Sequence, residues 1–146
     1  RGVEFSVAGP VAKGLYLVAG NVWLDATVSG EEVASGAIGR RPIGTFRRHS
    51  IASLDYQIPG VAPLSINAGF EATSARTANA KDSLRIPARA VLHLGGRYRF
   101  KVAQKPVLLR ANVQNVFNTF GWAVGGTGFF IPNGSRRYSL SLAADI

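Results

Sequence analysis

Apolar and polar residues alternate along most of this chain with a period of two. Between Leu64 and Thr73 the even positions are apolar, whereas the odd positions are small or polar. Successive side chains of a β-strand point to opposite faces, so this pattern predicts a strand with one apolar and one polar face. The final segment, 134–146, repeats the pattern, and its apolar face consists of Tyr138, Leu140, Leu142, Ala144 and Ile146.

Five further segments show the same alternation: 1–9, 15–27, 46–58, 84–101 and 107–116. The total is about seven strands with almost no helix. The register of the second segment is ambiguous, because residues 15–19 are apolar at both parities. There we place Tyr16, Val18, Gly20, Val22 and Leu24 on the apolar face, and Asn21, Trp23 and Asp25 on the polar face.

The connections between these strands alternate between short and long. Segments 9–14, 59–63 and 102–106 are short turns, whereas 29–45, 74–83 and 117–133 are long and irregular. Transmembrane β-barrels have tight periplasmic turns and long extracellular loops. If the last strand ends in the periplasm, all three short turns fall on the periplasmic side. Aromatic residues also lie near strand ends, as in interfacial girdles: Tyr56, Tyr98, Phe100, Phe117 and Tyr138.

The composition supports a membrane barrel over a soluble domain. Hydrophobic residues make up 47% of the chain, and charged residues only 17%, whereas soluble domains average about 25% charged residues. No apolar run approaches the roughly 20 residues that a membrane helix needs. The predicted fold is therefore all-β, an antiparallel up-and-down transmembrane β-barrel. A soluble ligand-binding β-barrel, one alternative, would explain the alternation but not the systematic difference between short and long connections.

The odd number of strands indicates part of a larger structure. Bacterial single-chain barrels have even strand numbers, with eight as the practical minimum. The chain is then the C-terminal part of a larger barrel, or a further strand lies within 117–133. A small self-contained porin or adhesin barrel with one extra strand is the other alternative.

The candidate chemistry favours binding over catalysis. His49 and His93 lie on different strands, and the chain has no cysteine, so we expect no metal site, no cofactor and no enzymatic activity. Asp55 and Glu71 fall on the polar face, where carboxylates more often meet arginine than perform acid–base work. The net charge is +9, but the basic residues cluster at strand ends and loops without an aromatic platform. We therefore do not expect nucleic acid as a partner.

Three segments resemble the barrel of TonB-dependent siderophore receptors. Residues 1–9 followed by 14–26 look like paired late-barrel strands of that family. Residues 108–118 are similar to its penultimate strand, ending in Asn115, Val116, Phe117 and Asn118, and residues 128–146 resemble its last loop and closing strand. The family's usual terminal Phe is Ile146 in this chain. The resemblance covers essentially the whole chain.

The resemblance implies a barrel of about 22 strands with a plug inside. Residues 1–146 would be its C-terminal segment, whereas the plug and the segment that contacts TonB would lie upstream. The implied function is energy-coupled uptake of a ferric siderophore across the outer membrane of a Gram-negative bacterium, although cobalamin or a saccharide remains open as cargo. Implied partners are the siderophore, the TonB complex and the outer membrane with its lipopolysaccharide.

Two groups of candidate site residues follow. Arginine forks and aromatic faces at the loop end suit a rigid siderophore, although arginine there also suits lipopolysaccharide phosphates or lumen acids. This extracellular rim consists of Arg40, Arg41, Arg47, Arg48, Trp122, Phe129, Phe130, Arg136 and Arg137. The polar strand faces would line the lumen and hydrogen-bond the plug through Arg89, Arg97, Arg99, Arg110, Asn112 and Gln114.

Overall fold

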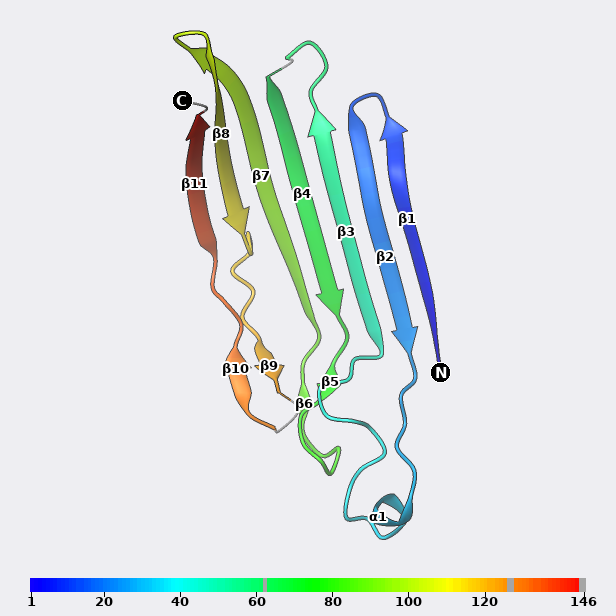
Figure 1. Cartoon of the computed structure of the whole chain (residues 1–146). Helices are drawn as coiled ribbons and strands as arrows, with labels where there is room; N and C mark the ends of the chain where they lie inside the picture. The colour runs from blue at the N-terminus through cyan, green and yellow to red at the C-terminus, as the bar shows by residue number, and fades with distance from the viewer. Residues whose placement is uncertain (62, 126–127, 145–146) are drawn as a thin grey trace.

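Seven long strands form one antiparallel sheet in which each strand lies beside its neighbour in the chain (Figure 1). The computed structural model describes residues 1–61, 63–125 and 128–144. The predicted all-β architecture and its seven-stranded sheet are confirmed. The strands, in sheet order, are β1 (Gly2–Ala12), β2 (Leu15–Leu24), β3 (Arg48–Gln57), β4 (Leu64–Thr73), β7 (Arg89–Val102), β8 (Lys105–Gln114) and β11 (Arg137–Ala144).

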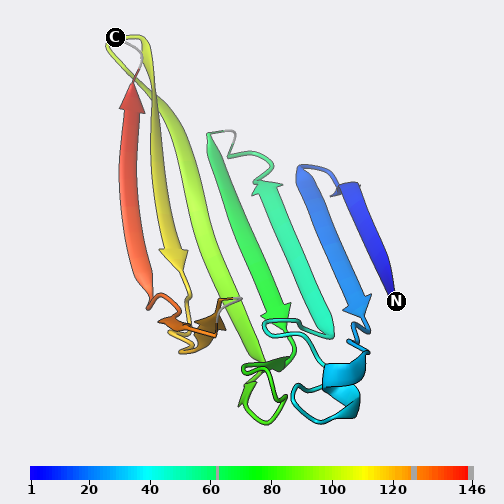
Figure 2. The same cartoon turned by 60° about the horizontal axis from the view of Figure 1, so that its bottom comes forward.

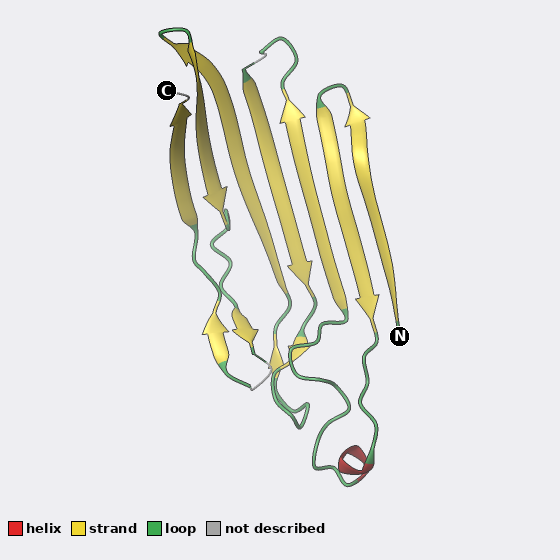
Figure 3. Ribbon diagram, viewed as in Figure 1, coloured by secondary structure: helices red, strands yellow, loops and turns green. Residues whose placement is uncertain are grey.

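The remaining elements are short and lie at one end of the sheet (Figure 3). They are the helix α1 (Glu31–Ala34), the pair β5 (Arg76–Thr77) and β6 (Arg85–Ile86), and the pair β9 (Trp122–Val124) and β10 (Phe130–Pro132). Because β9 and β10 pair with each other, the described part of loop 117–133 adds no eighth strand to the main sheet. In the described ranges, no helix is long and apolar enough to cross a membrane.

Most predicted strand boundaries differ from the structure by a few residues, and two of the differences involve proline. The predicted strand 84–101 is divided into β6 and β7 around Pro87, because proline has no N–H for a ladder hydrogen bond. The first strand continues beyond Gly9 through Pro10 to Ala12, with a register irregularity between Pro10 and Ala12. Pro10 is tolerated because β1 has only β2 as a neighbour in the described sheet.

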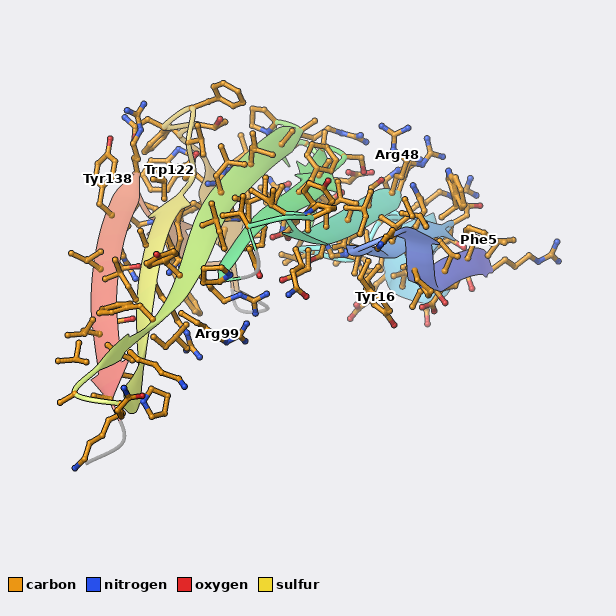
Figure 4. The ribbon with its side chains drawn as sticks, turned by 90° about the horizontal axis from the view of Figure 1, so that it is seen from above. Phe5, Tyr16, Arg48, Arg99, Trp122 and Tyr138 are labelled. Atoms are coloured by element: carbon orange, nitrogen blue, oxygen red, sulfur yellow. The ribbon has the colours of Figure 1, made fainter. Side chains whose placement is uncertain are left out.

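The two faces of the sheet differ in chemistry. Residues directly opposite each other on paired strands lie on the same face, and such pairs join Tyr138 to Val113 and Val113 to Leu94. On the other face, Arg110 lies opposite Arg97. Figure 4 shows the sheet curved, with Tyr138 and Arg48 on its convex face and Tyr16 and Arg99 on its concave face.

The convex face is apolar and uncovered. Leu140 is 73% exposed and Leu142 is 65% exposed, and Phe5 on the far edge strand is 62% exposed. The buried apolar residues of the described chain are only Ala78, Ile86, Val91 and Val107. An exposed apolar surface of this extent needs an apolar environment, and the alternation that produces it is that of a barrel wall facing lipid.

The predicted register of β2 is wrong. Leu15 lies opposite Tyr56 and Leu17 opposite Leu54, whereas Tyr16 lies opposite Asp55. The convex face therefore carries Leu15, Leu17, Ala19, Asn21 and Trp23, and the concave face carries Tyr16, Val18, Gly20, Val22 and Leu24. Because both parities of β2 are apolar, its own sequence could not decide, and the unambiguous patterns of β1 and β3 fix it through backbone pairing.

Aromatic residues border the convex face at both ends. Trp23 and Tyr138 lie near the end with the long loops, and Tyr56, Tyr98 and Phe100 lie near the short turns. Tyr98 and Phe100 stack with ring centroids 5.8 Å apart. The alternation predicted for the last strand is present from Tyr138 to Ala144, whereas Ile146 lies outside the described residues.

Candidate ligand-binding rim and lumen wall

All three long loops lie at the same end of the sheet, and all three short turns lie at the other (Figure 2). This arrangement follows from an antiparallel sheet whose strands are joined in chain order. It brings α1, the β5–β6 pair and the β9–β10 pair to one rim. The rim and the concave face below it contain most of the residues that the sequence predicts for binding the ligand and the plug.

Asp82 joins the first two long loops. Its Oδ1 accepts a hydrogen bond of 2.7 Å from Thr77 Oγ1 and lies 3.4 Å from the guanidinium of Arg85. Its Oδ2 lies 3.7 Å from Nε of Arg41, in the other loop. The Asp82 side chain is only 18% exposed, so a charge-assisted network in a half-buried position connects the loops.

Backbone contacts strengthen the same junction. The amide of Gly39 donates to the carbonyl of Ala80 at 2.7 Å, and the amide of Gly44 donates to that of Thr77 at 2.9 Å. A Cβ at Gly39 would lie 2.8 Å from the backbone carbon of Lys81. Only glycine allows this close approach, so the two loops form one packed unit.

Asn115 and Asn118 organise the third long loop. Asn115 is 4% exposed, and its side chain accepts from the Thr119 amide at 2.8 Å and donates to the carbonyls of Thr119 and Gly134 at 3.1 and 3.2 Å. Asn118 Oδ1 accepts from the Arg136 amide at 2.8 Å. Both residues have positive φ, 53° and 52°, which asparagine tolerates. The two asparagines therefore tie the start of the loop to its end.

Arg89 links the third loop to the wall. It begins β7 on the concave face, as predicted, and its guanidinium donates to the carbonyl of Thr119 at 3.2 Å. A Cβ at Gly121 would lie 2.6 Å from Cδ of Arg89. Arg89 is therefore engaged with the backbone of the third loop.

The predicted rim arginines divide between several environments. Arg40 is exposed, Arg41 pairs with Asp82, and Arg47 lies 3.7 Å from Asp25. Arg48 lies opposite Trp23 on the convex face, whereas Arg137 lies opposite Gln114 on the concave face. Nη1 of Arg136 donates to the hydroxyl of Tyr138 at 3.2 Å, so its guanidinium lies at the tip of a convex-face ring. The rim prediction treated these arginines as one group, and the fold separates them.

Two of the three predicted rim aromatics, Trp122 and Phe130, form part of a cluster. Trp122 contacts Phe120 and Phe130 edge-on, with ring centroids 5.3 and 6.4 Å away. Phe120 is 66% exposed and Phe129 is 55% exposed. Phe120 was missed at the sequence level, although its position two residues before Trp122 was a usable signal. The cluster offers exposed ring faces and edges on the third long loop.

The concave wall is basic and polar. Arg97, Arg99, Arg110, Asn112 and Gln114 share this face. The expectation that a lumen carboxylate meets arginine is confirmed, because Arg97 reaches across β4 to form an ion pair with Asp55.

Arg97 also lies directly opposite Arg110 on β8. Its Nε is buried and has no hydrogen-bond partner within the described residues. Two adjacent guanidinium groups therefore share the concave face, and the Asp55 carboxylate pairs only with Arg97, from the side of β3. An anionic or carbonyl-rich neighbour would fit this surface.

The two histidines have structural partners. His49 Nε2 lies 3.2 Å from Glu71 Oε1, and His93 Nδ1 accepts from the amide of Asn115 at 3.3 Å. The described residues contain no group of three or more His, Cys, Asp or Glu side chains suited to a metal.

The chain is similar to siderophore receptors. No model of a protein family matches it. The ferrichrome receptor FcuA of Yersinia enterocolitica is 29% identical over 147 residues, which cover 99% of this chain and 19% of that protein. The ferric preacinetobactin receptor BauA of Acinetobacter baumannii superposes with a TM-score of 0.89 at 26% identity, over 100% of this chain and 22% of BauA.

A more distant structure shares the fold. The siderophore receptor PiuA of Acinetobacter baumannii superposes over 97% of this chain with a TM-score of 0.79 at 16% identity. The chain spans about a fifth of the length of these proteins, 19%, 22% and 21%. The resemblance drawn from the sequence is confirmed, and these relatives are receptors rather than enzymes.

Proposed function

From the likeness of the whole chain to siderophore receptors, we propose that it is the C-terminal wall of a TonB-dependent receptor in the outer membrane of a Gram-negative bacterium. The whole receptor takes up a ferric siderophore. This chain supplies part of the barrel and three of its loops, and its role is transport rather than catalysis. The observation that carries the proposal is the combination of full-length likeness with an apolar convex face and a basic concave face.

The long loops face the cell exterior in this proposal. Short periplasmic turns and long extracellular loops are the rule in outer-membrane barrels, and the three short turns of this chain share one end of the sheet. The plug and the segment that contacts TonB belong to the upstream part of the receptor. The concave face then lines the barrel lumen.

The siderophore is bound by the rim residues that do not face the membrane. These residues combine cationic forks with the aromatic cluster of the third loop, and both suit an anionic complex with rigid aromatic or hydroxamate groups. Arg41 contributes through the junction at Asp82, and Arg48 and Arg136 are left out because of their convex-face positions. The proposed contacts are Arg40, Arg47, Trp122, Phe129, Phe130 and Arg137.

The concave wall holds the plug. Arg99 and Arg110 have no ion-pair partner among the described residues, and arginine suits an anionic or carbonyl acceptor. Acidic or carbonyl groups of the plug would satisfy Arg97, Arg99 and Arg110. Replacing Arg110 with glutamate should therefore release the plug from this wall, measured as increased passage of small solutes through the full-length receptor. Unchanged passage would contradict this role for Arg110.

Uptake of iron tests the proposed function directly. The full-length receptor is produced in a strain that lacks its other iron receptors, and radioactive iron is supplied as ferrichrome or as a ferric catecholate. We expect accumulation from at least one of these complexes, and its loss when TonB is absent. Passage that is independent of TonB and unselective for siderophores would favour a porin instead. Failure of both complexes, with TonB-dependent uptake of cobalamin or a saccharide, would reassign the cargo.

A further inference from the structure

Asn133 is the only asparagine of the chain that is followed by glycine. It lies between β10 and β11, in the segment that returns the third long loop to the wall (Figure 1). The backbone nitrogen of the residue after an asparagine can attack the asparagine side chain and close a cyclic imide. Glycine favours this reaction, because it has no Cβ beside the attacking nitrogen and its backbone adopts many conformations.

The reacting groups of this segment are free of hydrogen bonds. The backbone amide of Asn133 donates to the carbonyl of Gly121 at 2.9 Å, and the carbonyl of Gly134 accepts from Asn115 at 3.2 Å. Between these two anchors, the carboxamide of Asn133 and the backbone amide of Gly134 have no hydrogen-bond partner among the described residues. Gly134 is exposed, so water has access to the peptide bond that joins the two residues.

The other asparagines are held more firmly. Asn79 and Asn118 accept backbone hydrogen bonds through their side chains, and Asn115 is buried with its carboxamide bonded to the third loop. These bonds must break before a backbone nitrogen can attack the side chain, which raises the activation barrier. The remaining three asparagines lie within strands of the main sheet: Asn21, Asn67 and Asn112.

Asn133 also lines a polar cavity of about 230 Å³ between the wall and the third loop. The charged groups of the lining are Glu71, Arg76 and Arg89, so the cavity has one more cation than anion. A Cβ at Gly121 would lie 3.1 Å from Nε of Arg89 and 3.3 Å from Nδ2 of Asn133. The guanidinium and the carboxamide therefore lie close together, on the same side of this glycine.

We propose that Asn133 and Gly134 form a site of spontaneous deamidation whose product supplies a carboxylate to this cavity. The Gly134 nitrogen bonds to Cγ of Asn133 as the bond from Cγ to Nδ2 breaks, and the proton of the attacking nitrogen leaves with the side-chain nitrogen as ammonia. Because both groups belong to one segment, the attack is intramolecular. Water then opens the imide at either carbonyl, which gives aspartate or isoaspartate at this position.

The new carboxylate balances the excess positive charge beside Arg89. The reaction needs only water and the geometry of this loop, so it is independent of the cargo that the receptor carries. It would change the charge of the loop that holds the aromatic cluster.

Gly134→Ala is the matched control for the reaction. A Cβ at Gly134 would meet no atom within 4 Å, so alanine keeps the loop structure while its methyl group hinders the attack. The full-length receptor is incubated in detergent at mildly alkaline pH in heavy-oxygen water, and mass spectrometry with fragmentation locates the products. Asn133 should exchange its side-chain nitrogen for one heavy oxygen, and the rate should fall at least about ten-fold in Gly134→Ala.

Asn133→Gln keeps the reaction testable if Gly134→Ala does not assemble in the membrane. Its attack would need a larger ring, so this variant should stay unmodified. Intact Asn133 in the folded receptor, under conditions that deamidate a synthetic peptide of residues 131–136, would overturn the proposed site. Equal rates in wild type and Gly134→Ala would do the same, as would a rate at Asn118 equal to that at Asn133.

Asn133→Asp tests the carboxylate without the altered backbone of isoaspartate. The substitution should raise the melting temperature of the full-length receptor, because the carboxylate meets the excess cation of the cavity. The same substitution made in Arg89→Gln should give no increase over Arg89→Gln alone, since the cavity charges are then already balanced. An unchanged melting temperature in Asn133→Asp, or an equal increase in the Arg89→Gln background, would refute the role of the carboxylate.

Discussion

Single asparagines control how the third loop leaves and re-enters the barrel wall. Asn115 sits at the end of β8 with positive φ and bonds to both arms of the loop, at Thr119 and Gly134. Asn118 Oδ1 accepts a hydrogen bond from the amide of Arg136, which precedes β11. Asparagine meets all of these requirements, because its short side chain both accepts and donates hydrogen bonds and its backbone tolerates positive φ.

Asn115→Ala should therefore destabilise the receptor and loosen the third loop. The substitution removes the acceptor of the Thr119 amide and one donor to each of the carbonyls of Thr119 and Gly134, and the loss of these three hydrogen bonds costs about 1–3 kcal/mol. Thermal unfolding of the full-length receptor in detergent would measure the loss. Asn112→Ala is the control, because the Asn112 side chain makes only a 3.4 Å contact with Ser139. Equal melting temperatures for the two variants would show that Asn115 does not organise the loop.

Loops and strands act together at the scale of the elements. The first two long loops share the Asp82 network, the close approach at Gly39 and two backbone hydrogen bonds. The third loop is attached to β7 through Arg89. The rim is therefore a connected structure, and connected loops lose less conformational freedom when they bind a ligand.

Asp82→Ala should separate the first loop from the second. The change removes the acceptor for Thr77 Oγ1 and the partner of Arg41 and Arg85, so local opening should become easier by about 1–2 kcal/mol. Hydrogen exchange of peptides that contain the Gly39 and Gly44 amides should accelerate by about ten-fold. The exposed neighbour variant Lys81→Ala should exchange at the wild-type rate. A similar rate in both variants would argue against the network.

The whole sheet is organised by its two faces rather than by a core. Few apolar side chains are buried, and the large ones on the convex face are left uncovered. Such a sheet is stable only when lipid covers one face and a polar filling occupies the other. Polarity at each position is therefore set by the face and not by the depth of burial.

Arginine placed at neighbouring positions of β3 tests this rule. Leu54 is on the convex face, opposite Ala68, and Ser53 is on the concave face, opposite Gly69. Leu54→Arg should destabilise the barrel by about 2–4 kcal/mol near the bilayer midplane. Ser53→Arg should cost far less, because Gly69 leaves space beside it. Equilibrium unfolding of the full-length receptor from lipid vesicles would measure both, and similar losses would contradict the assignment of the faces.

Local chemistry alone determined a large part of this protein. In β4, β7, β8 and β11 the apolar residues occupy one set of alternate positions. The residues themselves therefore predict that each segment is a strand and which of its two faces is apolar. The lengths of the connections placed all long loops at one end, because chain-order antiparallel strands leave no other arrangement. The Asp55 partnership with an arginine also followed from its polar parity.

Only the tertiary structure decided features that depend on neighbours. β2 is apolar at both parities, and its register came from backbone pairing with β1 and β3. Arg136 and Arg137 look equivalent as adjacent cations, but one guanidinium bonds the convex-face Tyr138 and the other residue lies opposite Gln114. The junction at Asp82 joins residues far apart in the chain. Periodicity specifies which residues share a face, whereas contacts between strands and loops require the assembled sheet.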